Sequence, residues 1–142
     1  MTLWVFPIKP LFARQIYSGV KKYELRRRVK VKPGNIIVLY ETAPVKAITG
    51  EFVAGSVRLE KAEAVKAEVL RGLIPGCDER DLPYIGERGE VAIIEVLSPK
   101  RYRYPLTLSE LERVISKQRL RGAFRATRYP ELVRLLERAR RA

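Results

Sequence analysis

Three short apolar segments stand out in the alternation of hydrophobic and polar positions along the chain. They are Leu3–Ile8, Asn35–Glu41 and Val91–Leu97. Each is rich in β-branched or aromatic residues, and the last two are nearly continuous apolar runs between turn residues. Runs of this length and composition are typical of strands that are covered on both faces. We therefore predict core strands at these three positions.

Two further segments have strand patterns of a different kind. Lys46–Glu60 is apolar over much of its length, and its two internal glycines indicate bends or bulges in one long strand. In Lys21–Arg28 polar and apolar side chains alternate, which places Glu24 and Arg26 on the same face of a strand. The pattern thus predicts a charged strand next to the apolar ones.

Apolar residues at helical spacing predict four helices. Gly19 is expected to end the first helix, and Thr107 with Glu110 has the spacing of a capping box at the start of the third. Pro130 suits the first turn of the last helix, whose arginines, Arg140 among them, are expected to point outward. The predicted segments are Leu11–Ser18, Lys61–Leu73, a helix after Thr107 with the stripe Leu108, Leu111, Val114 and Ile115, and a helix from Pro130.

The predicted order is β-α-β-β-β-α-β-α-α. The turns between the core strands are too short for parallel crossovers, so the α+β class is favoured over a parallel α/β sheet. We expect a mixed, mostly antiparallel sheet curled into a β-barrel with flanking α-helices. A chain of 142 residues fits a single domain, 1–142, with the C-terminal helices of about 107–142 on or beside the barrel.

The distribution of charge along the chain indicates an anionic partner. The net charge is +13, and residues 1–50 carry ten Lys or Arg against two acids while residues 101–142 carry twelve against four. The middle, residues 51–100, has seven against ten. Two basic ends that meet in space would form one positive face, for which phosphate backbones are the expected partner. The Lys, Arg and Glu content, with few Asn and Gln, is thermophile-like.

The residue types that are scarce exclude several classes of chemistry. The chain has no histidine and one cysteine, Cys77, so histidine-based catalysis, cysteine metal sites and intrachain disulfides are not expected. No cofactor and no metal ligands are predicted. No apolar run approaches membrane-spanning length and no leader is recognisable, so we expect a cytoplasmic protein that does not enter a membrane.

The stretch Gly19–Arg28 combines five basic residues with one acid. Glu24 could accept hydrogen bonds from a base amino group, act as a general base, or only form an internal ion pair with Arg26. Lys21 could contact a phosphate. A solvated charged strand is the simpler alternative, because charge runs usually face water.

Within this stretch Gly19, Lys21, Glu24 and Arg26 have the spacing G-x-K-x-x-E-x-R, which resembles the signature of the ASCH domain family, a branch of the PUA-like superfamily. The preceding strand and short helix agree with that resemblance, and the later Pro33-Gly34-Asn35 turn with the Tyr40-Glu41 strand end resembles small archaeal-type members of the family. It implies a PUA-like barrel, RNA as the partner and a ligand cleft beside the motif.

The resemblance also implies an alternative function. One branch of the family is a small metal-independent amidohydrolase that acts on N4-acetylcytidine, with a lysine matching Lys21, a threonine matching Glu24, and a further glutamate. Glu24 departs from that pattern, and none of Asp78, Glu79 and Asp81 aligns with the further glutamate. If the chain is a hydrolase of a modified nucleoside or of RNA, Lys21 and Glu24 are its candidate catalytic residues.

Other candidates surround the motif. Lys9 precedes a helix start that leaves free N–H groups, and Tyr40 with Glu41 could line the same cleft from the next strand. Two pairs of aromatic residues among cations could stack bases. One pair is Tyr102 and Tyr104, and the other is Phe124 and Tyr129, which flank Arg125 and Arg128.

Overall, the sequence favours an RNA-binding domain with a cationic cleft, with DNA as the alternative partner and a role in regulating transcription or translation. Whether it is an enzyme is left open, with binding preferred, and no protein partner is predicted. The candidate ligand-binding residues are Lys9, Gly19, Lys21, Glu24, Arg26, Tyr40, Glu41 and Arg125.

Overall fold

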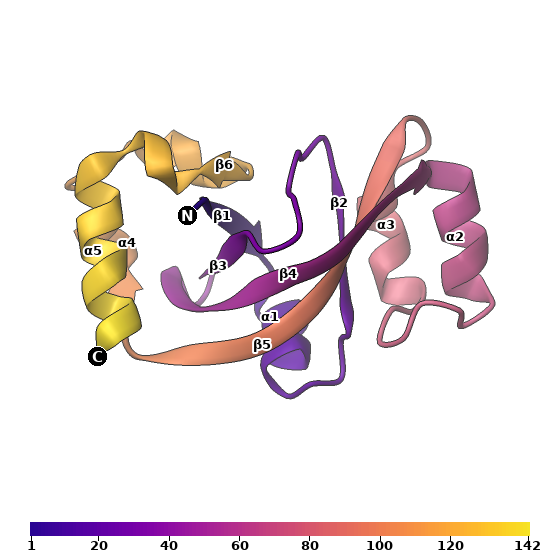
Figure 1. The fold of residues 1–142 in the computed structure, drawn as a ribbon, viewed down its shortest axis with the longest axis horizontal. Coiled ribbons are helices and arrows are strands. Elements are labelled where there is room, and N and C mark those ends of the chain that lie inside the picture. Colours follow the sequence, from indigo (N-terminus) through magenta and orange to yellow (C-terminus); the bar gives the residue numbers. More distant parts are fainter.

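The computed structural model describes residues 1–142 as one six-stranded sheet with helices at its ends and on one side (Figure 1). Figure 1 shows α5 and α4 at one end, α2 and α3 at the other, and the long strands β4 and β5 running between them. The strands are β1 (Leu3–Ile8), β2 (Tyr23–Arg27), β3 (Ile36–Glu41), β4 (Ala47–Lys61), β5 (Glu90–Thr107) and β6 (Phe124–Arg125). The helices are α1 (Pro10–Tyr17), α2 (Ala62–Leu70), α3 (Leu82–Ile85), α4 (Leu108–Leu111) and α5 (Pro130–Arg141), with 3₁₀ turns at Glu79–Asp81, Lys117–Arg121 and Ala126–Arg128.

The strand order is β2-β5-β4-β3-β1-β6. Only β1 and β3 pair in parallel; every other pair is antiparallel. The sheet curls into a half-barrel with β2 and β6 at its edges, which confirms the predicted mixed, mostly antiparallel α+β fold with flanking helices. No helix is long and apolar enough to cross a membrane.

Alternation along β1 and β3 divides the core between the two faces of the sheet. Val5 and Val38 face the C-terminal helices, where they join Leu132 and Leu136 of α5 in one buried cluster. Phe6 and Leu39 face the other way and pack with α1 in a second cluster. A third cluster joins the far ends of β2 and β5 to α2 and α3. The predicted double-sided burial of β3 is confirmed, since all six of its residues are buried.

Two predicted elements differ from the structure at the C-terminal end. α4 ends at Leu111, because Val114, Ile115 and Ser116 are poor helix formers and the chain turns there, although Leu111 and Ile115 remain buried. The capping box of Thr107 with Glu110 is confirmed. Arg140 does not point outward: its Nε donates to the buried Glu51 at 2.6 Å and so ties α5 to β4.

The loop before α3 packs against the chain just ahead of β2. Gly76 has φ +83°, and a Cβ there would meet the Val20 carbonyl oxygen and the Lys21 backbone. We predict that Gly76→Ala lowers the free energy of unfolding by about 1–3 kcal/mol for overpacking plus about 1 kcal/mol for the left-handed backbone. Gly72→Ala is the matched control in urea denaturation, since Gly72 has φ +70° but open space around it. Equal losses in the two variants would contradict the close packing.

Candidate functional site

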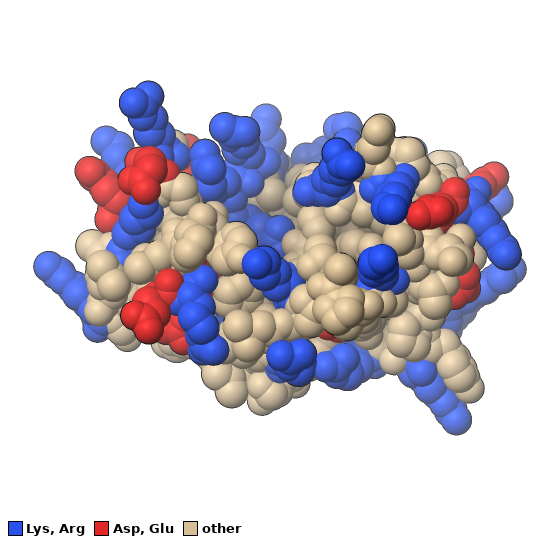
Figure 2. Space-filling model, turned by 180° about the vertical axis from the view of Figure 1, so that it is seen from behind, with Lys and Arg blue, Asp and Glu red and all other residues tan.

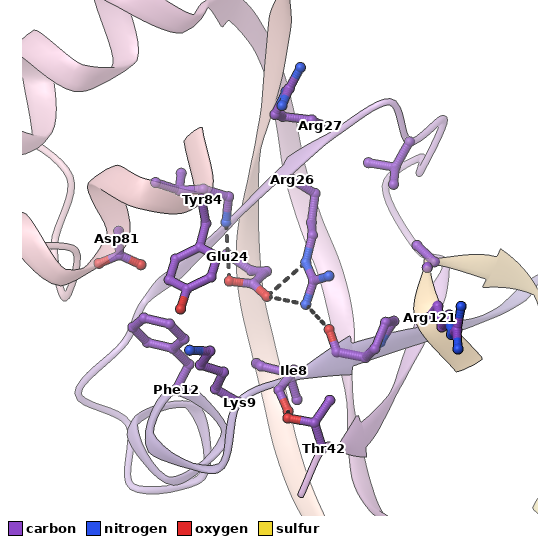
Figure 3. Close-up of a pocket in the computed structure, with 15 residues that line it drawn as sticks. Ile8, Lys9, Phe12, Glu24, Arg26, Arg27, Thr42, Asp81, Tyr84 and Arg121 are labelled. Carbon is purple, nitrogen blue, oxygen red and sulfur yellow. Dashed lines mark hydrogen bonds and ion pairs between the residues drawn. The ribbon is translucent and has the colours of Figure 1, made fainter. Parts of the chain in front are cut away.

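A cavity of about 400 Å³ opens where β1 and β2 meet the starts of α1 and α3 (Figure 3). The walls come from five separate parts of the chain, so the fold and not a local motif builds the site. The polar and aromatic residues that line it are Lys9, Phe12, Glu24, Arg26, Arg27, Thr42, Asp81, Tyr84 and Arg121.

Glu24 forms the buried acidic part of the cavity wall and is only 5% exposed. One carboxylate oxygen accepts the N–H of Leu25 at 3.2 Å, and the other accepts Nε and Nη2 of Arg26 at 3.0 and 2.9 Å. Arg26 also donates to the Pro7 carbonyl at 2.6 Å and lies over the Phe6 ring. The carboxylate is therefore held in place by the expected ion pair and still faces the cavity (Figure 3).

Lys21 lies beneath the site and not in its wall. Its side chain is fully buried, and Nζ donates to Oδ1 of Asp81 at 2.6 Å. The Phe12 ring covers the ammonium at 5.1 Å, and the Cys77 sulfur lies at 3.5 Å. Asp81 itself lines the cavity and accepts the Asp78 N–H with its other oxygen. Lys21 thus holds Asp81, a residue of the cavity wall, in place from the protein interior. Its burial contradicts the predicted direct contact of Lys21 with a phosphate.

The charges around Lys21 decide its protonation state. Burial by itself lowers the pKa of Lys21, but Glu24, Cys77 and Asp81 together raise this pKa above the usual value for lysine. Lys21 is therefore a cation at neutral pH. A protonated lysine can stabilise negative charge nearby but cannot accept a proton.

The mouth of the cavity combines cations with an aromatic pair. The ammonium of Lys9 lies 5.2 Å from the Tyr84 ring centre, and Tyr84 meets Phe12 edge-to-face at 5.7 Å. Arg27 and Arg121 are exposed on other sides of the opening. In Figure 3 the Lys9, Phe12 and Tyr84 side chains converge on one side of Glu24 and Arg121 lies on the opposite side. A flat polar ring could stack at this mouth with its edge toward the carboxylate.

Comparison with solved structures places this geometry in a known fold. The ASCH protein of Zymomonas mobilis matches with a TM-score of 0.70 and 21% identity, covering 87% of this chain and 86% of that chain. Its tyrosine-to-phenylalanine variant gives a TM-score of 0.72 at 20% identity, over 88% of this chain and 90% of that one.

The chain has the ASCH fold.

More distant similarities share this architecture. The N-terminal domain of McrB from Staphylothermus marinus has a TM-score of 0.52 and 14% identity over 85% of this chain and 86% of that chain. A Pseudomonas putida protein has a TM-score of 0.60 and 13% identity over 97% and 99%. No protein-family model and no curated protein matches the sequence.

In this ASCH fold Gly19 acts on the backbone and not on the cavity. Its φ of +82° ends α1, as the sequence predicts, and turns the chain toward β2. Gly19 and Lys21 are thus supports of the site, whereas Lys9, Glu24 and Arg26 line it.

Three predicted ligand residues lie elsewhere, and their placement in the cleft is wrong. The Tyr40 side chain is buried in the cluster under the C-terminal helices, because it alternates with Leu39 along β3. Glu41 is buried and accepts the Thr49 hydroxyl at 2.6 Å. Arg125, on β6, stacks over the ring of Trp4 on β1 and does not line the cavity.

The two tyrosines of β5 also fail to share a face. Tyr102 is buried and donates to Glu51 at 2.8 Å, whereas Tyr104 is 61% exposed. The register between β4 and β5 shifts here, with Gly50 opposite Arg101 but Ile48 opposite Leu106. The irregularity breaks the two-residue period on which the predicted stacking pair depends.

Sequence reasoning missed five polar or aromatic wall residues: Phe12, Arg27, Thr42, Tyr84 and Arg121. Phe12 belongs to the predicted apolar stripe of α1, and Tyr84 to a loop without a recognisable motif. Arg27 follows the motif directly, within a charge run of the kind that usually faces water. Only the three-dimensional fold brings Tyr84 and Arg121 to the motif, so no local signal marks them. The chain brings together no group of three or more acidic or cysteine side chains that could hold a metal ion.

The buried thiol behind the site gives a prediction for alkaline pH. Burial raises the pKa of Cys77 from about 9.0 to about 11, although Lys21 lowers it. A raised folded-state pKa stabilises the fold below pH 9, and this stability is lost as pH rises from 9 to 11. We predict that wild type loses on the order of 2 kcal/mol more than Cys77→Ala over this range in urea denaturation. Parallel losses would show that the thiol ionises freely.

Proposed function

We propose that the chain binds single-stranded RNA through this cavity, with one base inserted beside Glu24. The observation that carries the proposal is a buried, immobilised carboxylate in a pocket of about 400 Å³ whose rim is cationic. The Glu24 carboxylate accepts three hydrogen bonds, one from Leu25 and two from Arg26, and it can accept a further one from a ligand. Carboxylates accept hydrogen bonds from the cytosine amino group, so a base with an exocyclic amine fits.

The distribution of charge over the molecule supports the same partner. Figure 2 shows Lys and Arg side chains across the middle of one face, with the acidic side chains gathered mostly toward its two ends. Cations at the mouth, Lys9 among them, can neutralise phosphates while the Tyr84 ring stacks on a base. The ASCH fold and the spacing of the motif agree with RNA as the partner.

Salt dependence of binding tests this proposal. In fluorescence anisotropy with mixed-sequence RNA oligomers, the affinity should fall steeply with salt, because each neutralised phosphate releases counterions. Competition with DNA of the same sequence decides between the two nucleic acids. Absence of any salt-sensitive affinity for either would overturn nucleic-acid binding.

One observation favours a second candidate function, a small metal-independent hydrolase of a modified nucleoside such as N4-acetylcytidine, or of RNA. Asp81 lines the cavity with Lys21 directly behind it, close to Glu24. Glu24 would act as the general base, and the protonated Lys21 would hold Asp81 in position in the cavity wall. N4-acetylcytidine and labelled RNA would be incubated with wild type, Lys21→Ala and Glu24→Ala. Equal turnover by all three contradicts this function.

A further inference from the structure

We infer that residues 117–128 form a second contact surface, a phosphate track that receives the RNA backbone as it leaves the cavity. This inference rests on the proposed function and extends it to a site outside the motif. The segment contains five cations and no acid. The cations, here called the arginine band, are Lys117, Arg119, Arg121, Arg125 and Arg128.

The arginine band has no carboxylate partners within the protein. None of its side chains takes part in an ion pair of the structure. Arg26, Arg58 and Arg140, by contrast, are each held by a glutamate. Five uncompensated cations in twelve residues repel one another, a cost that an external polyanion would remove.

The backbone that carries the band is held firmly by the core. Leu120, Phe124 and Ala126 are buried between the cations, and β6 pairs with β1. The guanidiniums of Arg119 and Arg125 lie over the rings of Phe124 and Trp4, at 4.9 and 5.3 Å. A guanidinium stacked on a ring keeps its N–H edges free, so these donors are positioned before any ligand arrives.

Continuity with the cavity identifies the partner. Arg121, Gly122 and Ala123 line the cavity, so the segment that carries the band passes the cavity mouth, with Lys117 and Arg119 before it in the chain and Arg125 and Arg128 after it. A strand with one base in the cavity would bring its next phosphates onto the band. A lipid surface is a poorer fit, because no large apolar side chain of residues 117–128 is exposed for insertion.

The test compares a long and a short probe. Anisotropy titrations would use fluorescein-labelled octacytidylate, with cytidine monophosphate as the short probe measured by calorimetry. The track variant is Lys117→Gln/Arg119→Gln/Arg128→Gln, which spares Arg121 in the cavity wall and the Arg125–Trp4 stack. The matched control is Arg134→Gln/Arg138→Gln/Arg141→Gln, which removes the same charge from exposed, unpaired arginines of α5.

The track variant should bind octacytidylate at least tenfold more weakly than the control at low salt. Its slope of log affinity against log salt should fall by about 2, at about 0.7 for each phosphate contact on a single strand. Its affinity for cytidine monophosphate should change less than twofold. If the track variant and the control lose affinity equally, or if affinity does not rise with probe length, the track is wrong while base binding stands. If wild type binds neither probe, both proposals fail.

Discussion

Replacing Lys21 by methionine is expected to lower the free energy of unfolding by about 3–5 kcal/mol. The Lys21 side chain is fully buried and Asp81 is 8% exposed, so the substitution leaves an uncompensated carboxylate in the interior. Removing one partner of a buried ion pair has a cost of this order. Urea denaturation followed by circular dichroism at neutral pH measures the effect.

Two variants separate this cause from a general loss of charge. Lys22→Met removes a charge from the neighbouring exposed position and should change stability by less than about 0.5 kcal/mol. Lys21→Met/Asp81→Asn removes both charges while the amide oxygen can still accept the Asp78 N–H, so it should recover part of the loss. A single variant as stable as wild type would show that the pair contributes no net stability.

The fold could be predicted because its signals are local. β1 follows the apolar pattern over its full predicted length, Leu3–Ile8, and Gly19 ends α1 at the expected place. β5 runs from Glu90 to Thr107 and so extends ten residues beyond the predicted end at Leu97. This extension is hard to predict, because Ser98 and Pro99 interrupt the strand pattern. The long pairing with β4 overrides that local preference.

The candidate site could be predicted only in part, because its chemistry depends on contacts between distant residues. Glu24 and Arg26 are two residues apart on one strand, so their ion pair follows from the period of the strand. Lys21 and Asp81 are sixty residues apart, and only packing of the α3 region against the start of β2 joins them. A lysine in a basic run is normally solvated, which explains why its burial went unrecognised.

The second failure of sequence reasoning has a different cause. Glu41 was expected in a ligand cleft, yet it is buried with a hydroxyl partner, and Glu51 is likewise buried with hydroxyl and arginine partners. Irregular register in β4 and β5 directs these side chains inward. The protein thus uses buried carboxylates for two purposes: Glu41 and Glu51 link β3 to β4 and β4 to α5, whereas Glu24 and Asp81 face a cavity.

Replacing Glu24 by glutamine is expected to weaken cytidylate binding and abolish its preference over uridylate. Glutamine preserves the size of the side chain, and its oxygen can still accept from Arg26. Its amide adds a donor that suits the uracil carbonyl and opposes the cytosine amine. Contacts to a base edge discriminate by up to about 1–3 kcal/mol, so the preference should change by about 5–150-fold. Calorimetry with the two mononucleotides measures both affinities.

Glu137→Gln is the matched control, because it makes the same change of charge at an exposed position of α5, away from the cavity lining. It should leave both affinities within twofold of wild type. If Glu24→Gln behaves like Glu137→Gln, the carboxylate does not read the base, and its function is to hold Arg26 against Pro7. Because Glu24 both faces the cavity and binds Arg26, base preference is the readout that separates the two roles, whereas a loss of overall affinity would follow from either.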